Sequence, residues 1–417
     1  MLITTIAAAV MPSCVIASAI GPRQANRITV NVDKKYQTID GFGFSEAFQR
    51  AYNIYNLPEP KRTEVLDLLF NTTTGAGFTI VRNGIGSSPS SQNDWMNTIL
   101  PVKYGVKTFY GNAWSAPGFM KTNGRDSNGG GLCGLPGATC SSGDWRQAYA
   151  DYLVKYIQLY AQEGVDVTHL GFVNEPDFST SYASMQVNGN QAADFIKILH
   201  PTLAKSNLSH VAITCCEATG WNAQSQYTQQ LKSAGVENMV GVITGHTYTS
   251  GISFAQPTTR KVWETECSDL SGGWSTAWYS WGASGDGYTW ANNIYTGLTT
   301  GNVSAYLWWV GTQDRAMNNN NNEKLILVER DSYQVSKRLW ALRTTAFLNT
   351  DGTLAVNVIN TGASAASISI SGANGTSVQA WVTDNTHDMD LTTASSAGDG
   401  TITGSVPGRA IVSFVIS

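Results

Sequence analysis

The chain has 417 residues, of which 42% are hydrophobic and 13% are charged, and it carries a formal net charge of −4 at pH 7. This length accommodates one large domain plus a smaller one, and the composition is that of a globular protein and excludes a disordered chain. The small negative charge excludes a strongly basic surface, so we expect no nucleic-acid partner.

The N-terminus has the pattern of a secretory signal sequence. The residues from Leu2 to Ile20 are apolar or small, and Ala17-Ser18-Ala19 fits the small-x-small pattern of a cleavage site. The usual basic segment is missing, since the first basic residue is Arg23. The apolar run ends after Ala19, which argues against a membrane anchor. We therefore expect residues 1–19 to be a signal peptide and the mature protein to be secreted, extracellular and not membrane-bound.

Export is consistent with the cysteines, because secreted proteins can keep disulfides. Cys133 and Cys140 bracket a Gly/Pro-rich loop and could close a short disulfide. Once Cys14 leaves with the signal peptide, one pair and one odd thiol remain among Cys215, Cys216 and Cys267. No second Cys-x-x-Cys or His pair accompanies these three, so we expect no zinc site. Glycosylation is expected at some of the sequons Asn71, Asn207, Asn302 and Asn374.

Eight short apolar segments recur along the first three quarters of the chain. They are Thr38–Phe44, Phe78–Gly84, Lys107–Trp114, His169–Asn174, His210–Cys216, Val240–Thr247, Lys261–Glu266 and Ala305–Val310. Between several of them, apolar residues at three- and four-residue spacing predict the helices Glu59–Phe70, Trp145–Glu163, Gln191–Ser206 and Ser332–Leu342. Strands alternating with helices in this way predict a (β/α)8 TIM barrel over residues 38–345. The run Asn318–Asn322 then reads as a loop after the eighth strand.

The C-terminal part has a different pattern. Alternating apolar residues separated by Gly, Asn and Ser turns occur in Leu354–Asn360, Ala366–Ile370, Val378–Thr383, Thr401–Thr403 and Ala410–Ile416. This predicts a small antiparallel β-domain over residues 346–417. Arg27–Val32 also reads as a strand, and residues 20–37 are expected to join that domain.

Polar residues follow the predicted barrel strands, at the rim where barrel enzymes place their active sites. In Asn174-Glu175-Pro176 the proline ends the fourth strand and leaves a carboxylate at its tip. On the seventh strand, Glu264 and Glu266 share one face, and Glu266 lies nearer the rim. Glu217, at the end of the fifth strand, is a third contender. Several rim carboxylates suit glycoside cleavage, which uses one as a proton donor and another as a nucleophile or base.

The motifs around these carboxylates resemble one glycosidase family. Val173-Asn174-Glu175-Pro176 is similar to the acid/base motif of retaining glycosidases built on (β/α)8 barrels, and Trp263-Glu264-Thr265-Glu266 resembles the nucleophile motif of glycoside hydrolase family thirty. Asp40–Ala47 is similar to the first strand of that family, and a barrel joined to a side β-domain is its architecture. The stretches Phe44–Asn56 and Trp263–Asp269 most resemble the fungal subgroup that acts on xylan.

The resemblance implies that Glu175 is the general acid/base and that Glu266, rather than Glu264, is the nucleophile, and it weakens the case for Glu217. Asn174 would bind the sugar 2-hydroxyl, and Arg82 would lie beneath the nucleophile and lower its pKa. The side chains expected to complete the substrate-binding set are Arg50, Asn112, Trp114, His246, Tyr248 and Trp309, with Tyr248 bonded to Glu266 and Arg50 binding a glucuronic acid branch. We also expect some of Trp274, Trp278 and Trp281 to line the cleft, and Ser87–Trp95 could close one end of it.

The resulting hypothesis is a secreted, monomeric, retaining endo-β-1,4-xylanase that acts on xylan, preferably glucuronoxylan, and could release xylobiose from chain ends. It needs no cofactor, since two carboxylates and water suffice. Two alternatives remain. One is another β-glycosidase of the same family, acting on β-1,6-glucan or glucosylceramide. The other is a non-catalytic carbohydrate-binding protein, for which the paired carboxylates would be unnecessary.

Overall fold

The computed structural model describes residues 25–87, 104–270, 272–315, 321–341, 347–373 and 375–417. The expected signal peptide, the Asn374 sequon and all of the Ser87–Trp95 loop except Ser87 lie outside the described residues. Within the described ranges, none of the helices has the length and apolar character needed to cross a membrane.

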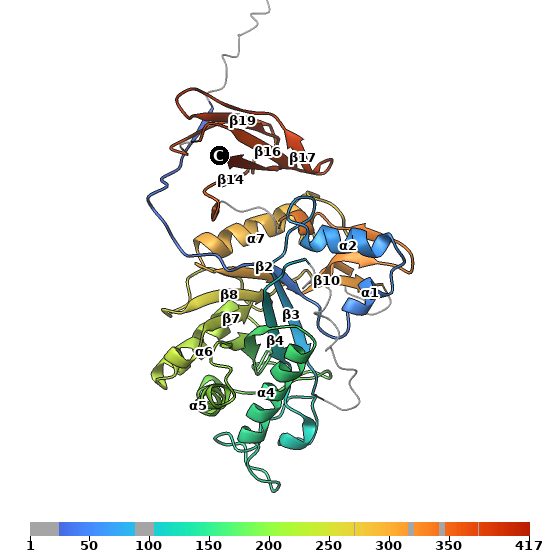
Figure 1. The fold of residues 1–417 in the computed structure, drawn as a ribbon, viewed down its shortest axis with the longest axis vertical. Helices are drawn as coiled ribbons and strands as arrows, with labels where there is room; N and C mark the ends of the chain where they lie inside the picture. The colour runs from blue at the N-terminus through green and yellow to red at the C-terminus, as the bar shows by residue number, and fades with distance from the viewer. Residues whose placement is uncertain (1–24, 88–103, 271, 316–320, 342–346, 374) are drawn as a thin grey trace, which may run out of the picture.

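Eight parallel strands close into a barrel (Figure 1). They are β2 (Gly41–Ser45), β3 (Ile80–Ile85), β4 (Thr108–Ala113), β5 (Val167–Gly171), β6 (Ala212–Ala218), β7 (Val242–His246), β8 (Lys261–Glu266) and β9 (Ala305–Trp308). Each overlaps one of the eight predicted segments, so the predicted barrel is confirmed. Strand β2 needs glycine where it packs on β3, because a Cβ at Gly43 would lie 2.0 Å from the carbonyl oxygen of Ile80.

Helices connect most of the barrel strands and lie outside them (Figure 1). They are α1 (Ala51–Tyr55), α2 (Lys61–Phe70), α4 (Arg146–Gln162), α5 (Gly189–Lys205), α6 (Trp221–Ser233), α7 (Gly287–Thr299) and α8 (Arg338–Ala341). The 3-10 turns are η2 (Gly118–Met120), η3 (Glu237–Met239) and η4 (Asn321–Glu323). A capping box begins α5, in which Asn188 Oδ1 accepts from the Gln191 amide at 3.0 Å and Gln191 Oε1 accepts from the Asn188 amide at 2.9 Å.

A small extra sheet follows the eighth barrel strand and corrects one prediction. Strands β10 (Val310–Asp314) and β11 (Lys324–Val328) are parallel, and β12 (Tyr333–Val335) pairs antiparallel with β11. The predicted helix Ser332–Leu342 is therefore wrong in its first half, and among its described residues only Arg338–Ala341 are helical. The free edge of β11 offers pairing that outweighs the weak helical spacing of this segment. Strand β10 lies between the eighth barrel strand and the Asn-rich run; residues 318–320 of that run lie outside the described residues, and Asn321 and Asn322 begin η4.

Two antiparallel-rich sheets form the C-terminal β-domain, which lies at one end of the molecule beyond α7 (Figure 1). One sheet has the order β1 (Asn26–Thr29), β15 (Ala366–Ser371), β19 (Ile402–Val406) and β18 (Ala394–Ser396). The other has the order β13 (Phe347–Leu348), β14 (Leu354–Ile359), β20 (Ile411–Ile416), β16 (Val378–Thr383) and β17 (Asp388–Thr392). The N-terminal strand β1 therefore belongs to this domain, where it pairs in parallel with β15.

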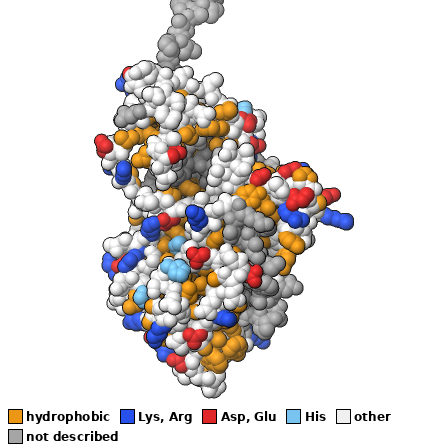
Figure 2. All heavy atoms as spheres, viewed as in Figure 1, with side chains coloured by type: hydrophobic (Ala, Val, Ile, Leu, Met, Phe, Trp, Pro, Cys, Tyr) orange, Lys and Arg blue, Asp and Glu red, His pale blue; other side chains and the backbone are white. Residues whose placement is uncertain are grey.

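Hydrogen bonds join the β-domain to the segment that precedes α7. The indole nitrogen of Trp278 donates to the carbonyl oxygen of Arg409 at 2.7 Å, and Asn385 Oδ1 accepts from the backbone amides of Trp278 and Tyr279. On the face drawn in Figure 2, charged side chains are scattered among uncharged polar ones, as the low charged fraction of the sequence predicts.

Candidate active site

Two carboxylates face each other across the C-terminal rim of the barrel. Glu175 lies in the loop after β5, and Glu266 is the last residue of β8. One carboxylate oxygen of each lies within 4.8 Å of the other and of a ring nitrogen of His246. Carboxyl groups about 5–5.5 Å apart are typical of retaining glycosidases, whereas inverting enzymes need a wider gap for a water molecule. The geometry therefore suits a double displacement.

Glu266 is held in place by a cation and a hydroxyl. Arg82 Nη1 donates a hydrogen bond to Glu266 Oε2, and the Tyr248 hydroxyl donates to Oε1 at 3.1 Å. Burial raises the pKa of the Glu266 carboxyl, an effect to which Glu175 adds and which the charges of His246 and Arg82 oppose. The predicted contacts of Arg82 and Tyr248 with Glu266 are thus both present in the structure.

Glu217 has more partners than either of these carboxylates. Its carboxylate oxygens lie 2.9 Å from Arg82 Nη2, 2.6 Å from the Tyr110 hydroxyl and 2.8 Å from His246 Nε2. Burial by itself would raise its pKa, but the charges of Arg82 and His246 and the hydrogen bond from His246 outweigh it and lower the pKa to about 2. Arg82 and His246 therefore stabilise the charged form of Glu217.

His246 bridges two of the three carboxylates. Its Nδ1 lies 3.1 Å from Glu175 Oε1, and its Nε2 lies 2.8 Å from Glu217 Oε2. Burial would lower its pKa, but the charge of Glu266 and the hydrogen bonds to Glu175 and Glu217 raise the pKa to about 10. The distances among Glu175, His246 and Glu266 would also suit a metal ion. Both ring nitrogens of His246 already contact carboxylates, however, so a metal ion here would have to displace one of these contacts.

The two asparagines predicted for the site are both buried, and both contact Arg82. Asn174 Oδ1 accepts from Arg82 Nη2 at 2.5 Å, and Asn174 is 2% exposed. Asn112 is fully buried between the hydroxyl of Tyr110, the carbonyl oxygen of Val173 and Arg82 Nη2, which lie 3.1, 3.2 and 3.1 Å from its amide atoms. Asn112 therefore supports Arg82 and Asn174 from below.

An aromatic wall stands beside the carboxylates. The rings of Trp114 and Trp309 lie 5.9 Å apart, and Phe48 packs edge-on against both. The guanidinium of Arg82 lies over Trp114 at 4.6 Å, and that of Arg50 lies over Trp309 at 5.0 Å. The predicted residues Arg50, Trp114 and Trp309 are thus brought to one side of the site.

Sequence reasoning missed Tyr182 and Phe48. Tyr182 is half exposed, its ring packs on Phe48 at 6.3 Å, and burial together with the charges of Glu175 and Glu266 raises the pKa of its hydroxyl. Both residues lie in loops, where no periodicity indicates which way a side chain points. Only their position shortly after Glu46 and Glu175 could have indicated them.

The tryptophans after β8 do not behave as one cleft wall. Trp278 is fully buried against the β-domain, so it is not one of the tryptophans that could line the cleft. The Trp274 indole donates to Gln334 at 2.8 Å and lies under the guanidinium of Arg338. Trp281 is 94% exposed. Helix α7 begins at Gly287, shortly after these tryptophans.

Glu264 is a buried acid behind the site. It accepts a hydrogen bond from the Thr247 hydroxyl at 3.2 Å, and burial raises its pKa from 4.5 to about 8, although the charge of His246 opposes this. The folded protein therefore holds this proton more tightly than the unfolded chain does. Its contribution to stability is full below pH 4.5 and is lost as the pH rises toward 8.

We expect Glu264→Gln to flatten part of the pH dependence of stability. The amide mimics the neutral acid and has no proton to lose, so the variant avoids a loss of the order of 4 kcal/mol over this range. Urea unfolding of both proteins at pH 5 and pH 8 measures the effect. An identical loss of unfolding free energy in variant and wild type would contradict it.

Comparisons with known proteins support a glycosidase. Residues 94–265 match the Glycosyl hydrolase family 30 TIM-barrel domain, and residues 332–414 match the Glycosyl hydrolase family 30 beta sandwich domain. The solved catalytic domain of GH30 xylanase C from Talaromyces cellulolyticus is 40% identical, with a TM-score of 0.87 over 94% of this chain and 100% of that chain.

Curated relatives with other activities are more distant. Putative glucosylceramidase 4 of Caenorhabditis elegans is 24% identical over 43% of this chain and 40% of its own length. The endo-1,6-beta-D-glucanase neg1 of Aspergillus fumigatus is 29% identical over 41% of this chain and 42% of its own length. The chain spans about half or less of the length of the curated relatives it matches.

Proposed function

The chain belongs to glycosyl hydrolase family 30, and from this membership we propose that it is a retaining endo-β-1,4-xylanase that prefers glucuronoxylan. The observation that carries the reaction type is the separation of Glu175 and Glu266, whose nearest oxygens lie within 4.8 Å. The xylan substrate is supported by the 40% identity to a xylanase along nearly the whole chain.

In this proposal the reaction has two steps. Glu266 attacks the anomeric carbon while Glu175 gives its proton to the departing glycosidic oxygen, which leaves a covalent glycosyl–Glu266 ester. Glu175, now a carboxylate, then takes a proton from water, and the hydroxide attacks the same carbon and releases Glu266. In the same proposal, Arg82 and Tyr248 orient Glu266 for the attack, and the Asn174 amide bonds the sugar 2-hydroxyl.

Product analysis tests the substrate. We expect glucuronoxylan to be cleaved fastest and to yield acidic oligosaccharides with the branch at a fixed position, whereas β-1,6-glucan and glucosylceramide stay intact. Cleavage of β-1,6-glucan alone would leave the catalytic roles of Glu175 and Glu266 in place but contradict xylan as the substrate. The failure of all three substrates would favour a non-catalytic sugar-binding protein.

We assign Arg50 to recognition of the glucuronic acid branch. Its guanidinium is stacked on Trp309 and held by a hydrogen bond from Nη1 to the carbonyl oxygen of Ala47 at 2.7 Å. A guanidinium fixed in this way can meet a carboxylate with paired hydrogen bonds.

Arg50→Ala is expected to lower kcat/KM on glucuronoxylan by roughly 10–100-fold, the range for loss of a charge-assisted contact, and to change cleavage of unbranched xylan little. Parallel rates on the two polymers measure this. An equal loss on both would contradict the assignment and point to a structural role.

We also propose that the protein is exported and acts outside the cell as a monomer. The signal-like N-terminus supports export, as do the disulfides Cys133–Cys140 and Cys215–Cys216, which persist in oxidising compartments. Mass spectrometry of protein from the culture medium should place the mature N-terminus at Ile20, and light scattering should give the mass of a single chain.

A further inference from the structure

Glu217 is saturated with hydrogen-bond donors in a position where no substrate can reach it. Its carboxylate accepts from Arg82 Nη2 at 2.9 Å, from the Tyr110 hydroxyl at 2.6 Å and from the Thr265 hydroxyl at 3.0 Å, and it also meets His246 Nε2 at 2.8 Å. The side chain is completely buried. These four donors come from β3, β4, β8 and β7, so one carboxylate ties four barrel strands together.

The two charged partners of Glu217 each lead to one of the facing carboxylates. Arg82 reaches Glu266 through Nη1 and Glu217 through Nη2. His246 reaches Glu175 through Nδ1 and Glu217 through Nε2. In addition, the backbone carbonyl of Glu217 accepts from the Glu175 amide at 2.9 Å. The Glu217 carboxylate is therefore connected to the Glu266 carboxylate through Arg82 and to the Glu175 carboxylate through His246.

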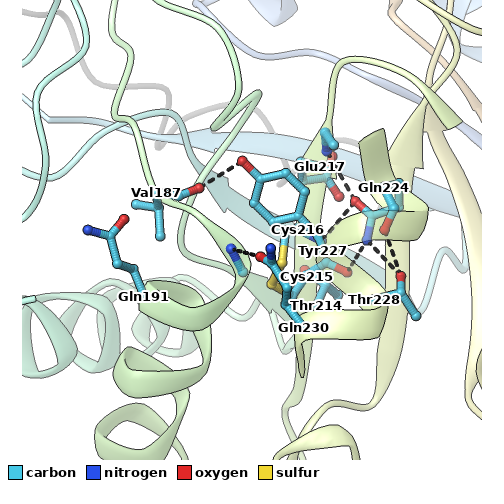
Figure 3. The surroundings of a disulfide bond; sticks show 12 residues. Val187, Gln191, Thr214, Cys215, Cys216, Glu217, Gln224, Tyr227, Thr228 and Gln230 are labelled. Carbon is cyan, nitrogen blue, oxygen red and sulfur yellow. Dashed lines mark hydrogen bonds between the residues drawn. A yellow bond between two sulfur atoms is a disulfide. The ribbon is translucent and has the colours of Figure 1, made fainter. Parts of the chain in front are cut away.

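The backbone on both sides of Glu217 is held from behind. Gln224 Oε1 accepts from the amide of Cys216 at 3.3 Å and from the amide of Ala218 at 3.2 Å, so one side chain brackets Glu217 (Figure 3). The neighbouring Cys215–Cys216 disulfide lies beside Gln224 and Tyr227 in the same view. This backing fixes the direction in which the Glu217 carboxylate points.

We propose that Glu217 is a positioning residue that aims Arg82 at Glu266 and His246 at Glu175, and whose fixed negative charge keeps the site neutral through the first chemical step. The inference rests on the proposed two-step function. Before attack, the charges of Arg82 and His246 are balanced by Glu217 and Glu266 while Glu175 carries its proton. In the glycosyl–enzyme, Glu266 is an uncharged ester and Glu175 is the anion, so the balance is unchanged.

The balance requires that His246 stay a cation. The charged or titratable groups around it are Glu175, Glu217, Glu264, Glu266, Arg82 and Tyr248. Among these carboxyl groups, burial raises the pKa of Glu264 to about 8, whereas Arg82 and His246 lower the pKa of Glu217 to about 2. Glu217 is thus the anion near His246 whose charge is independent of both the working pH and the stage of the reaction.

The variants Glu217→Gln and Glu264→Gln form a matched pair, because both replace a buried barrel carboxyl by its amide. We expect Glu217→Gln to lower kcat by about 100-fold, the loss that a small misplacement of reacting groups causes, with little change in KM. We expect Glu264→Gln to retain wild-type kcat and KM at pH 6. Rates are measured on whichever glycoside the wild type cleaves.

The decisive readout is the protonation of His246, which needs no substrate. The chain has five histidines, so their ¹⁵N signals can be assigned by substituting the other four in turn. In the wild type and in Glu264→Gln, His246 should remain an imidazolium from pH 5 to about 9, since its pKa is about 10. In Glu217→Gln its pKa should fall by about 1–3, because its closest anion is lost.

Two results would overturn the proposal. One is a neutral His246 in the wild type at pH 7, which decides the matter even if Glu217→Gln does not fold. The other is a folded Glu217→Gln variant with unchanged kcat and unchanged His246 titration. If the wild type cleaves no xylan, the proposed substrate fails, but the titration still tests the role of Glu217.

Discussion

Replacing Glu266 by alanine is expected to lower kcat/KM on xylan by at least about 10⁴-fold, because the reaction loses the atom that attacks the anomeric carbon. The fold should survive, since Arg82, the charged partner of Glu266, keeps Glu217 as a second partner when Glu266 is removed. Initial rates on glucuronoxylan measure the loss, and thermal unfolding of the variant checks its integrity.

Azide distinguishes loss of the nucleophile from general damage. The small anion can enter the space left by the Glu266 side chain and attack an activated β-xyloside directly, which yields an α-xylosyl azide and restores part of the rate. Glu264→Gln is the control, because its carboxyl lies on the same strand but should take no part in the reaction. Substantial residual activity in Glu266→Ala without azide would contradict the assignment.

Replacing Glu175 by alanine should slow xylan cleavage by about 10²–10⁴-fold, the usual contribution of general acid–base catalysis. The loss must depend on the leaving group. A xylan chain leaves as an alcohol and needs a proton, whereas a dinitrophenolate leaves without one. The first step on a dinitrophenyl xyloside should therefore be nearly as fast as in the wild type, and the glycosyl–enzyme should accumulate.

A burst of dinitrophenolate release from the aryl xyloside shows that the first step is fast and the second is slow. Azide provides a second test. With Glu175 removed and Glu266 present, azide should attack the glycosyl–enzyme and yield the β-xylosyl azide. The two variants therefore give azides of opposite configuration. An equal loss on alcohol and aryl leaving groups would show that Glu175 does not act as the acid.

The barrel was predictable from the sequence because each strand is a short apolar run that differs from its helical neighbours. The prediction of secondary structure failed where the spacing of apolar residues is compatible with both a helix and a strand. The segment at Tyr333–Val335 has weak helical spacing, yet it pairs with β11, whose edge is invisible in the sequence. Helix α7 was missed because Gly287–Thr299 is rich in aromatic and small residues rather than in strong helix formers.

In the site, strand-end position indicated several carboxylates and the family resemblance singled out Glu175 and Glu266, but neither showed what Glu217 does. Its importance depends on four partners from different strands, and the sequence contains no measure of such convergence. The same limit applies to the tryptophans. Trp114 and Trp278 are equally suited to a sugar cleft by type, and only the structure places the first beside Arg82 and the second against the β-domain.

The most direct test of the central claim is covalent trapping of the nucleophile. An activated 2-deoxy-2-fluoro-β-xyloside slows the second step, so the glycosyl–enzyme should accumulate and add one fluoroxylosyl mass to the protein. Peptide mapping is expected to locate this mass on Glu266, with stoichiometric loss of activity. A label on Glu217, Glu264 or Glu175, or continued turnover of xylan with no label at all, would contradict the account.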